Sequence, residues 1–280
     1  MELLENRERV TGLFADFEWN YMAVAILEGF HGEVLVDELD EPHIAALRLP
    51  SLNFSIVGGD PEHPAARAYI ANLPRRSFMI FADRHEEWSA LGQEYHGVAF
   101  FEIPRYAFTS EKLDPAYIQS LRDRQMDGLM LKQMDLALAQ QLKAEKGEFS
   151  EDHLGNFVSL EEFIEKGFGF VILDGERIVS VATTFVVCDA GIEIQINTRK
   201  KYEGIGLGTV VGAALIAESL TRGLDPNWDA ANQRSAGLAK KFGYTEQGEY
   251  SMVIVFGSRV LIGFLLGLKK VVGVFRKNTE

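Results

Sequence analysis

The fold of the C-terminal half can be inferred from the stretch Glu193-Ile194-Gln195-Ile196-Asn197-Thr198-Arg199-Lys200-Lys201-Tyr202-Glu203-Gly204-Ile205-Gly206-Leu207-Gly208. Residues 191–198 are expected to form a strand, and residues 209–222 a helix of small and apolar residues. The glycines between them let successive backbone N–H groups point into one concavity, and the helix adds its free N–H groups and the positive end of its dipole. This order predicts a cradle for an anion such as a pyrophosphate, with donors supplied by the backbone.

The segments around this stretch predict a mixed α/β domain. Strands are expected over 168–173 and 177–187, joined by the hairpin turn Asp174-Gly175-Glu176, because Asp-Gly supplies the positive φ of a tight reversal. A helix is expected over 132–146, and a strand, a helix and a strand over 227–230, 235–242 and 248–255. Two other nucleotide motifs do not fit, because there is no Gly-Lys-Ser/Thr sequence for a P-loop and no second βαβ unit with a ribose-binding acid.

With its neighbours, the glycine stretch resembles the acetyl-CoA motif of the GNAT superfamily. Downstream, the form Pro226-x-Trp228-Asp229-x-x-Asn232-x-x-Ser235 is similar to one GNAT subfamily, which includes the zwittermicin A resistance type. Looser likeness continues upstream, so that the resemblance spans about residues 20–256 and is most specific over 193–244. It implies an α/β fold (α+β, with a mixed sheet), with a GNAT domain in the C-terminal half and a smaller α/β domain before it.

The resemblance also implies roles for individual residues. The co-substrate would be acetyl-CoA, and the activity N-acetyl transfer to an amine of a small molecule. Strand backbone groups at Ile196, Asn197 and Thr198 would meet the pantetheine arm, and Asn232 would lie near the thioester. The pyrophosphate would be held by Gly204, Ile205, Gly206, Leu207, Gly208 and Thr209.

Two positions depart from the superfamily pattern. Glu203 stands where Arg or Gln is frequent, so the positive charge near the pyrophosphate would come from Arg199, Lys200 or Lys201. Ala239 stands where many relatives carry a tyrosine general acid. Tyr244 is close in sequence, but it is better interpreted as a packing aromatic. These departures keep a second hypothesis open, in which a degenerate GNAT fold binds acyl-CoA or serves as a scaffold without catalysis.

Glu193 and Asp229 are the candidate catalytic residues. The acceptor amine must lose a proton to attack the thioester, and a carboxylate with a raised pKa can take that proton. Both residues are expected near strand ends beside the cofactor cleft. The competing interpretation is a structural hydrogen bond to the backbone, and for Asp229 this interpretation is favoured.

Composition limits the class of protein. The 280 residues are 47% hydrophobic with a net charge of −13, so a nucleic-acid-binding face is not expected. The single cysteine, Cys188, lies in an apolar run and is expected to be a buried structural thiol. The histidines show no paired spacing typical of metal ligands, so no metal is expected. The acidic start lacks the basic region of a signal peptide, which favours a cytoplasmic protein.

Three regions are expected along the chain. Residues 1–125 would form an N-terminal α/β domain, interpreted as a degenerate GNAT-like copy, and residues 126–256 the acetyltransferase domain. Residues 257–280 form a basic, apolar tail whose apolar run is too short to span a bilayer. Docking of this tail on the domain, or on a second subunit of a homodimer, is favoured over membrane contact.

Overall fold

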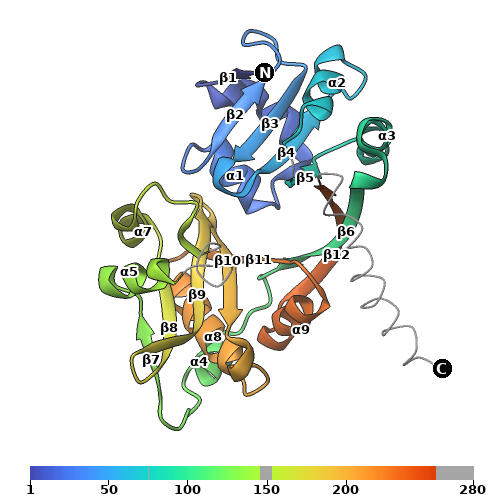
Figure 1. Ribbon diagram of the computed structural model, residues 1–280. Helices are drawn as coiled ribbons and strands as arrows, with labels where there is room; N and C mark the ends of the chain where they lie inside the picture. Colours follow the sequence, from blue (N-terminus) through green and yellow to red (C-terminus); the bar gives the residue numbers. More distant parts are fainter. Residues whose placement is uncertain (75, 146–152, 257–280) are drawn as a thin grey trace, which may run out of the picture.

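One continuous sheet organises the molecule. The computed structural model describes residues 1–74, 76–145 and 153–256. Within these ranges twelve strands form a single sheet in the order β1-β2-β3-β4-β5-β12-β6-β11-β10-β9-β8-β7. The expected mixed α/β architecture is confirmed, and β6 and β12 run between the two halves of the molecule (Figure 1). The tail over 257–280 lies outside the described residues.

The N-terminal half supplies the first part of this sheet. Its elements are β1 (Glu2–Leu3), the 3-10 segment η1 (Arg7–Phe17), α1 (Tyr21–Leu27), β2 (Glu33–Val36), β3 (Ile44–Leu49), the turn η2 (Pro50–Leu52), β4 (Phe54–Gly59), α2 (Pro64–Ala71), β5 (Ser77–Phe81), α3 (His85–His96), η3 (Gly97–Ala99) and β6 (Phe100–Thr109).

The C-terminal half follows a linking helix, α4 (Pro115–Arg122). Its elements are β7 (Leu129–Gln133), α5 (Leu136–Ala144), α7 (Leu160–Lys166), β8 (Gly169–Asp174), β9 (Arg177–Val187), β10 (Gly191–Thr198), η4 (Lys200–Tyr202), α8 (Leu207–Thr221), β11 (Asp225–Ala230), α9 (Gln233–Phe242) and β12 (Thr245–Val255).

The two halves repeat one succession of elements. In each, an edge strand and helical segments precede three antiparallel strands, and the third of these is followed by a helix, a parallel strand, a second helix and a last strand. The last strands are exchanged, because β12 pairs with β5 whereas β6 pairs with β11. This topology is what a second, GNAT-like copy would show, and the exchange makes the two copies share one sheet.

One expected element begins later than its sequence suggested. The helix expected from residue 132 begins at Leu136, because Lys132 and Gln133 belong to β7 and pair with Val171 and Phe170 of β8. Asp135 caps the helix by accepting a hydrogen bond from the backbone N–H of Leu138 at 2.8 Å.

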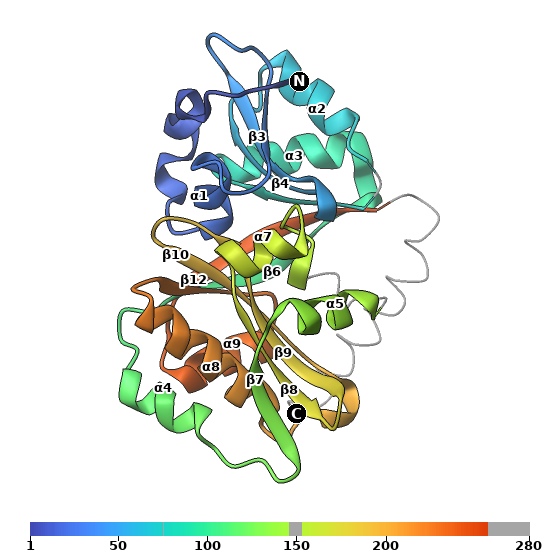
Figure 2. The ribbon, with the colours of Figure 1, turned by 90° about the vertical axis from the view of Figure 1, so that its left-hand side faces the viewer.

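The domain boundary expected at residue 125 lies after the end of α4. Ile118 and Leu121 of this helix are buried in the core of the C-terminal half, and α4 packs along α8 (Figure 2). By packing, α4 therefore belongs to the C-terminal half, while the exact domain boundary stays a prediction.

Helix α8 lies unusually close to the sheet. A Cβ placed on Gly212 would lie 2.6 Å from Ile196 Cδ1 and 2.8 Å from Phe242 Cζ. A side chain at position 212 would therefore require the side-chain ends of Ile196, on β10, and of Phe242, on α9, to move. Among the described residues, no helix has both the length and the apolar character that crossing a membrane would require.

Candidate active site

Strands β10 and β11 separate in front of α8. They pair in parallel only at Gly191 with Asp225, Ile192 with Pro226 and Glu193 with Asn227. A β-bulge between Glu193 and Ile194 marks the point of separation. Beyond it, β10 continues to Thr198 with ladder pairing only to β9 among the described strands. The backbone groups of β10 that face β11 are thus left for a ligand at this fork.

The Glu193 side chain links the two strands where they separate. Its Oε1 accepts a hydrogen bond from the backbone N–H of Asp229 at 2.9 Å, and its Oε2 accepts one from Asn227 Nδ2 at 2.7 Å. Burial, and next the charge of Asp229, raise the pKa of Glu193 to about 8, outweighing these hydrogen bonds. The fork therefore contains a buried carboxyl group whose pKa lies well above its ordinary value.

Asp229 has a different role. Its carboxylate is 3% exposed and pairs with Arg105, whose Nε lies 3.1 and 3.0 Å from the two oxygens and whose Nη2 lies 2.9 Å from Oδ2. Tyr250 donates a further hydrogen bond to Oδ2 at 2.5 Å. Burial opposes the charge of Arg105, but the attraction of Asp229 prevails and raises the pKa of the guanidinium. Asp229 is thus occupied as the partner of a buried cation.

The glycine turn connects η4 to the first turn of α8. Gly204 and Gly206 have φ of 81° and 94°, in the left-handed region, and Gly206 caps the helix. The first N–H groups of α8, at Leu207 and Gly208, therefore face out of the helix end, as an anion site requires.

One ion pair and one hydrogen bond involve charged side chains beside this turn. The Glu203 carboxylate pairs with Arg234 at 2.9 Å, so its charge is matched by a cation. On the other side, Lys241 Nζ donates to Thr209 Oγ1 at 2.9 Å and adds a positive charge at the start of α8. Arg199, one of the expected basic residues, pairs with Glu145 and donates to the carbonyl of Ile178.

A cavity of about 780 Å³, here called the main cavity, joins the fork to the glycine turn. It brings together most of the predicted site residues: Glu193, Ile196, Asn197, Thr198, Gly206, Gly208, Thr209, Asp229 and Asn232. Gly204, Ile205 and Leu207 do not line it, since Ile205 is 66% exposed and Leu207 is buried in the core. A neighbouring hollow of about 470 Å³ shares Asn197, Thr198 and Glu203 and adds the basic residues Arg177, Arg199, Lys200 and Lys201.

Several residues of the main cavity were not predicted from the sequence. Arg105 comes from β6, and Met22, Phe54 and Phe78 come from the N-terminal half. No motif marks them, because the exchange of β6 and β12 brings them to the fork from distant parts of the chain. The sequence feature that could have pointed to them is Arg105, a charged residue within a segment rich in apolar residues that forms a strand.

Four further residues can be compared with their expected roles. Tyr244 is buried and donates to the carbonyl of Pro226 at 2.6 Å, so it is a packing residue as expected. Ala239 is fully buried in α9. Cys188 is buried, and burial raises the pKa of its thiol to about 11, which agrees with a structural role. Asn232, expected near the thioester, also caps α9 by accepting from Ser235 N at 3.0 Å.

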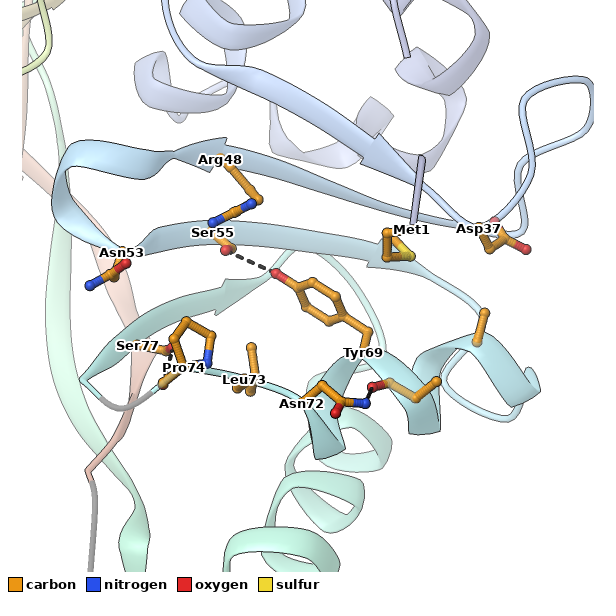
Figure 3. A pocket seen from close by; sticks show the side chains of 12 residues that line it. Met1, Asp37, Arg48, Asn53, Ser55, Tyr69, Asn72, Leu73, Pro74 and Ser77 are labelled. Atoms are coloured by element: carbon orange, nitrogen blue, oxygen red, sulfur yellow. Dashed lines mark hydrogen bonds between the residues drawn. The ribbon is translucent and has the colours of Figure 1, made fainter. Parts of the chain in front are cut away.

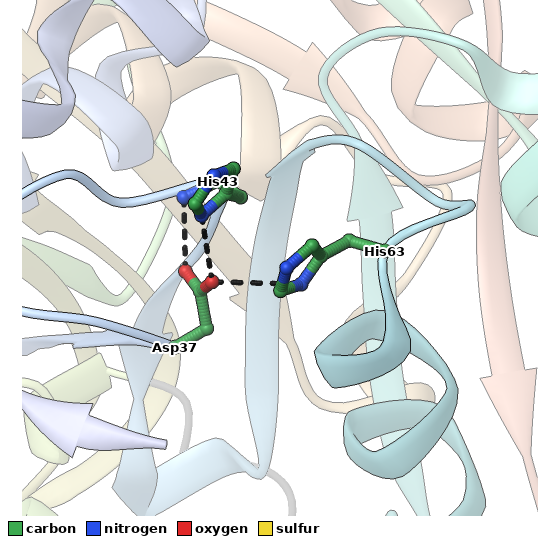
Figure 4. A group of neighbouring side chains, drawn as sticks. All are labelled: Asp37, His43 and His63. Atoms are coloured by element: carbon green, nitrogen blue, oxygen red, sulfur yellow. Dashed lines mark hydrogen bonds and ion pairs between the residues drawn. The ribbon is translucent and has the colours of Figure 1, made fainter.

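Two other features lie in the N-terminal half. A hollow of about 360 Å³ is lined by polar residues such as Arg48, Ser55 and Tyr69, whose hydroxyl donates to Ser55 Oγ at 3.0 Å (Figure 3). The second feature is a cluster of Asp37, His43 and His63 (Figure 4).

The Asp37 cluster is explained by local structure. Asp37 Oδ1 accepts from the backbone N–H groups of His43 and Ile44 at 3.0 Å each, while Oδ2 lies 3.2 and 3.5 Å from Nδ1 of His43 and of His63. His63 Nδ1 also accepts from Ala65 N at 3.3 Å as the cap of α2, and the two imidazoles stack with centroids 4.5 Å apart. A turn and a helix cap thus account for a grouping that the sequence spacing did not predict.

Comparison with known proteins agrees with this geometry. A GCN5-related N-acetyltransferase-like protein from Streptococcus suis 89/1591 is 31% identical, with a TM-score of 0.79 over 90% of this chain and 98% of that one. A GCN5-related N-acetyltransferase from Kribbella flavida, at 12% identity, shares the fold with a TM-score of 0.59 over 86% of this chain and 96% of that one.

A curated relative is also similar: YdfB, described as an uncharacterized N-acetyltransferase of Bacillus subtilis (strain 168). It is 32% identical over 127 residues, which is 45% of this chain, and the match spans about half (48%) of that relative's length. The model of the GNAT acetyltransferase family matches residues 11–253. The chain therefore belongs to the GNAT acetyltransferase family.

Proposed function

We propose that this protein transfers the acetyl group of acetyl-CoA to an amine of a small molecule. The observation that carries the proposal is the fork, where β10 separates from β11 directly in front of the start of α8, with the main cavity between them. The pantetheine arm would lie along β10, bonded to the backbone at Ile196, Asn197 and Thr198. The pyrophosphate would bind at the N–H groups that begin α8.

The Glu203 departure does not oppose this binding. Its carboxylate is paired with Arg234, and Lys241 and the basic hollow supply positive charge around the turn. The Pro226-to-Ser235 pattern further supports, within the GNAT family, the zwittermicin A resistance-type subfamily.

In the proposed reaction Glu193 acts as the base. Its carboxylate takes a proton from the acceptor ammonium, and the freed amine attacks the thioester carbonyl. A C–N bond forms, the C–S bond breaks, and CoA leaves as a thiolate. The second proton that the nitrogen loses on becoming an amide passes through solvent to this thiolate. Backbone N–H groups of β10 near the fork would stabilise the oxyanion of the tetrahedral intermediate. Because a thiolate is a good leaving group, the reaction does not depend on a tyrosine at position 239.

Two measurements test the proposal together. Isothermal titration should show binding of acetyl-CoA, and release of free CoA thiol should depend on added amine across a broad panel. The absence of acetyl-CoA binding would reject the proposal. Binding without turnover on any amine would instead favour a non-catalytic acyl-CoA-binding or scaffold protein.

A further inference from the structure

The main cavity continues past the fork into an apolar chamber. Its walls come from both halves of the molecule, through α1, η2, β4, β5, β9 and β12. The side chains are Met22, Leu52, Phe54, Phe78, Phe185 and Met252. Leu52, Phe78 and Phe185 remain partly exposed, so they present apolar surface to whatever enters. A ligand that buries an apolar group here gains on the order of 25 cal/mol per Å² of area removed from water.

The chamber does not suit a polycation. The carboxylates that line the main cavity are Glu193, Glu203 and Asp229. Glu203 is paired with Arg234 and Asp229 with Arg105, while Glu193 already accepts two hydrogen bonds. A substrate with several ammonium groups would therefore find no uncommitted carboxylate for its second charge among the lining residues described.

Arg105 offers hydrogen-bond donors to the same chamber. Its Nε and Nη2 are used by Asp229 and Tyr250. Among the described residues, Nη1 donates to Met252 Sδ at 3.9 Å, and this sulfur is a weak acceptor for a nitrogen that carries two N–H bonds. Both residues line the cavity, and the Arg105 side chain is only 15% exposed. A buried guanidinium whose Nη1 meets only a weak acceptor is suited to bind a second carboxylate.

Glu193 and Arg105 are also close enough to serve one small substrate. Both contact Asp229, Glu193 through the backbone N–H at 2.9 Å and Arg105 through the carboxylate at 2.9 Å. In an α-amino acid a single carbon separates the amino group from the carboxylate, so one such molecule can meet two groups that contact the same residue.

We infer that the acceptor is an α-amino acid with a large apolar side chain. Its carboxylate binds Arg105, its side chain fills the apolar chamber, and its amino group lies at the fork beside Glu193. This inference rests on the proposed function. The step is the one described above, in which the α-nitrogen gains the acetyl group, Glu193 takes the proton and CoA leaves as the thiolate.

Substrate variation provides the cleanest test, because changing Arg105 would also remove the partner of Asp229. The full chain is assayed for acetyl transfer to L-phenylalanine, L-leucine, glycine, phenethylamine and spermine. We expect kcat/KM to be highest for phenylalanine and leucine. It should fall at least about tenfold for phenethylamine, which lacks the carboxylate, and by a similar factor for glycine, which lacks the apolar side chain.

One protein variant adds a check on the chamber. Phe78→Ala removes a partly exposed ring and should narrow the preference for phenylalanine over glycine while acetyl-CoA binding is unchanged. Spermine or phenethylamine as the best substrate would overturn the inference and leave the proposed function standing. If no amine is acetylated although acetyl-CoA binds, the proposed function fails. In that case L-phenylalanine is titrated into the CoA-saturated protein to test whether the amino acid binds. The absence of binding would overturn the inference as well.

Discussion

At the scale of single residues, Glu193 and Asp229 show how two adjacent carboxyl groups acquire different chemistry. Both are buried at the fork, but Arg105 and Tyr250 stabilise the charge of Asp229, whereas Glu193 receives only neutral hydrogen bonds. Burial therefore raises the pKa of Glu193. The assignment of a base follows from the partners of each group rather than from its position in the sequence.

This difference predicts the pH dependence of activity. Since the pKa of Glu193 is raised to about 8, the carboxylate fraction, and with it kcat/KM, should rise with pH and level off above that value. Glu193→Gln should lower kcat/KM by about 10²-fold or more and remove the inflection. Glu203→Gln, which changes a carboxylate paired with Arg234, is the matched control and should keep the inflection in the pH profile. The acceptor's own titration is common to all three proteins, so a Glu193→Gln variant that retains the inflection would contradict this role.

For Asp229 the main expected effect is on stability. Asp229→Asn leaves the buried Arg105 without a counter-charge, and breaking such a pair costs about 3–5 kcal/mol of unfolding free energy. Arg234→Gln breaks the exposed pair with Glu203, where the guanidinium is 69% exposed, and should cost no more than about 1 kcal/mol. Urea unfolding measures both variants. Equal losses would show that burial of the Arg105 pair has no energetic consequence.

At the scale of elements, both ends of α8 need glycine for its positive φ, but only one end lies at the main cavity. Gly206 begins the helix with φ of 94° beside the cavity, and Gly223 follows its last turn with φ of 74°. A Cβ would meet no atom within 4 Å at either position. Both substitutions therefore introduce mainly backbone strain, of about 1–2 kcal/mol, but only Gly206 belongs to the proposed phosphate cradle.

Substitutions at Gly206 and Gly223 together distinguish an effect on acetyl-CoA binding from an effect on the stability of the protein. Gly206→Val and Gly223→Val should lower the melting temperature by similar amounts. Only Gly206→Val should weaken acetyl-CoA binding, by at least about tenfold, because a strained turn moves the N–H groups that begin α8. Isothermal titration with acetyl-CoA measures this. Weakening of similar size in both variants would mean that the turn acts through the stability of α8 alone.

The same element scale shows what the sequence could predict. The strand, glycine turn and helix of 191–222 are local patterns, so their order could be predicted from the spacing, while the cofactor cradle stays a prediction. The start of α5 was misplaced because Lys132 and Gln133 continue a strand that only pairing with β8 defines. The β-bulge at Glu193 and the fork next to it could not be predicted from the sequence, because they depend on where β11 stops pairing with β10.

At the scale of the whole molecule, the exchanged strands explain why half of the candidate site was missed. Arg105 on β6 reaches Asp229 on β11 across 124 positions of sequence, and Tyr250 on β12 joins them. No local pattern specifies such pairing. The N-terminal copy lacks a matching fork, since β4 and β5 stay paired from Phe54 to Val57 and α2 begins at a proline. In the proposed function, the C-terminal half would thus hold the cofactor, and the N-terminal half would line the acceptor end of the main cavity.

The contact between the halves predicts one more pH effect. His31, from the N-terminal half, accepts a hydrogen bond at Nε2 from Val187 N at 3.0 Å, which leaves its Nδ1–H to donate to the carbonyl of Asn156 at 2.9 Å. Burial lowers the pKa of His31, while Glu162 and Lys166 act on it in opposite directions. Because the folded pKa lies below the unfolded value, the contribution of His31 is complete above about pH 6.5 and is lost as the pH falls.

His31→Gln tests this coupling, since glutamine can accept from Val187 and donate to Asn156 without titrating. The unfolding free energy of the natural chain should decline more steeply between pH 7.5 and pH 5 than that of the variant, by at most about 1.4 kcal/mol per pH unit. Urea midpoints at several pH values measure the difference. The buried His153, whose pKa is also lowered by burial, is present in both proteins and cancels. Identical slopes would mean that protonation of His31 does not loosen the contact between the two halves.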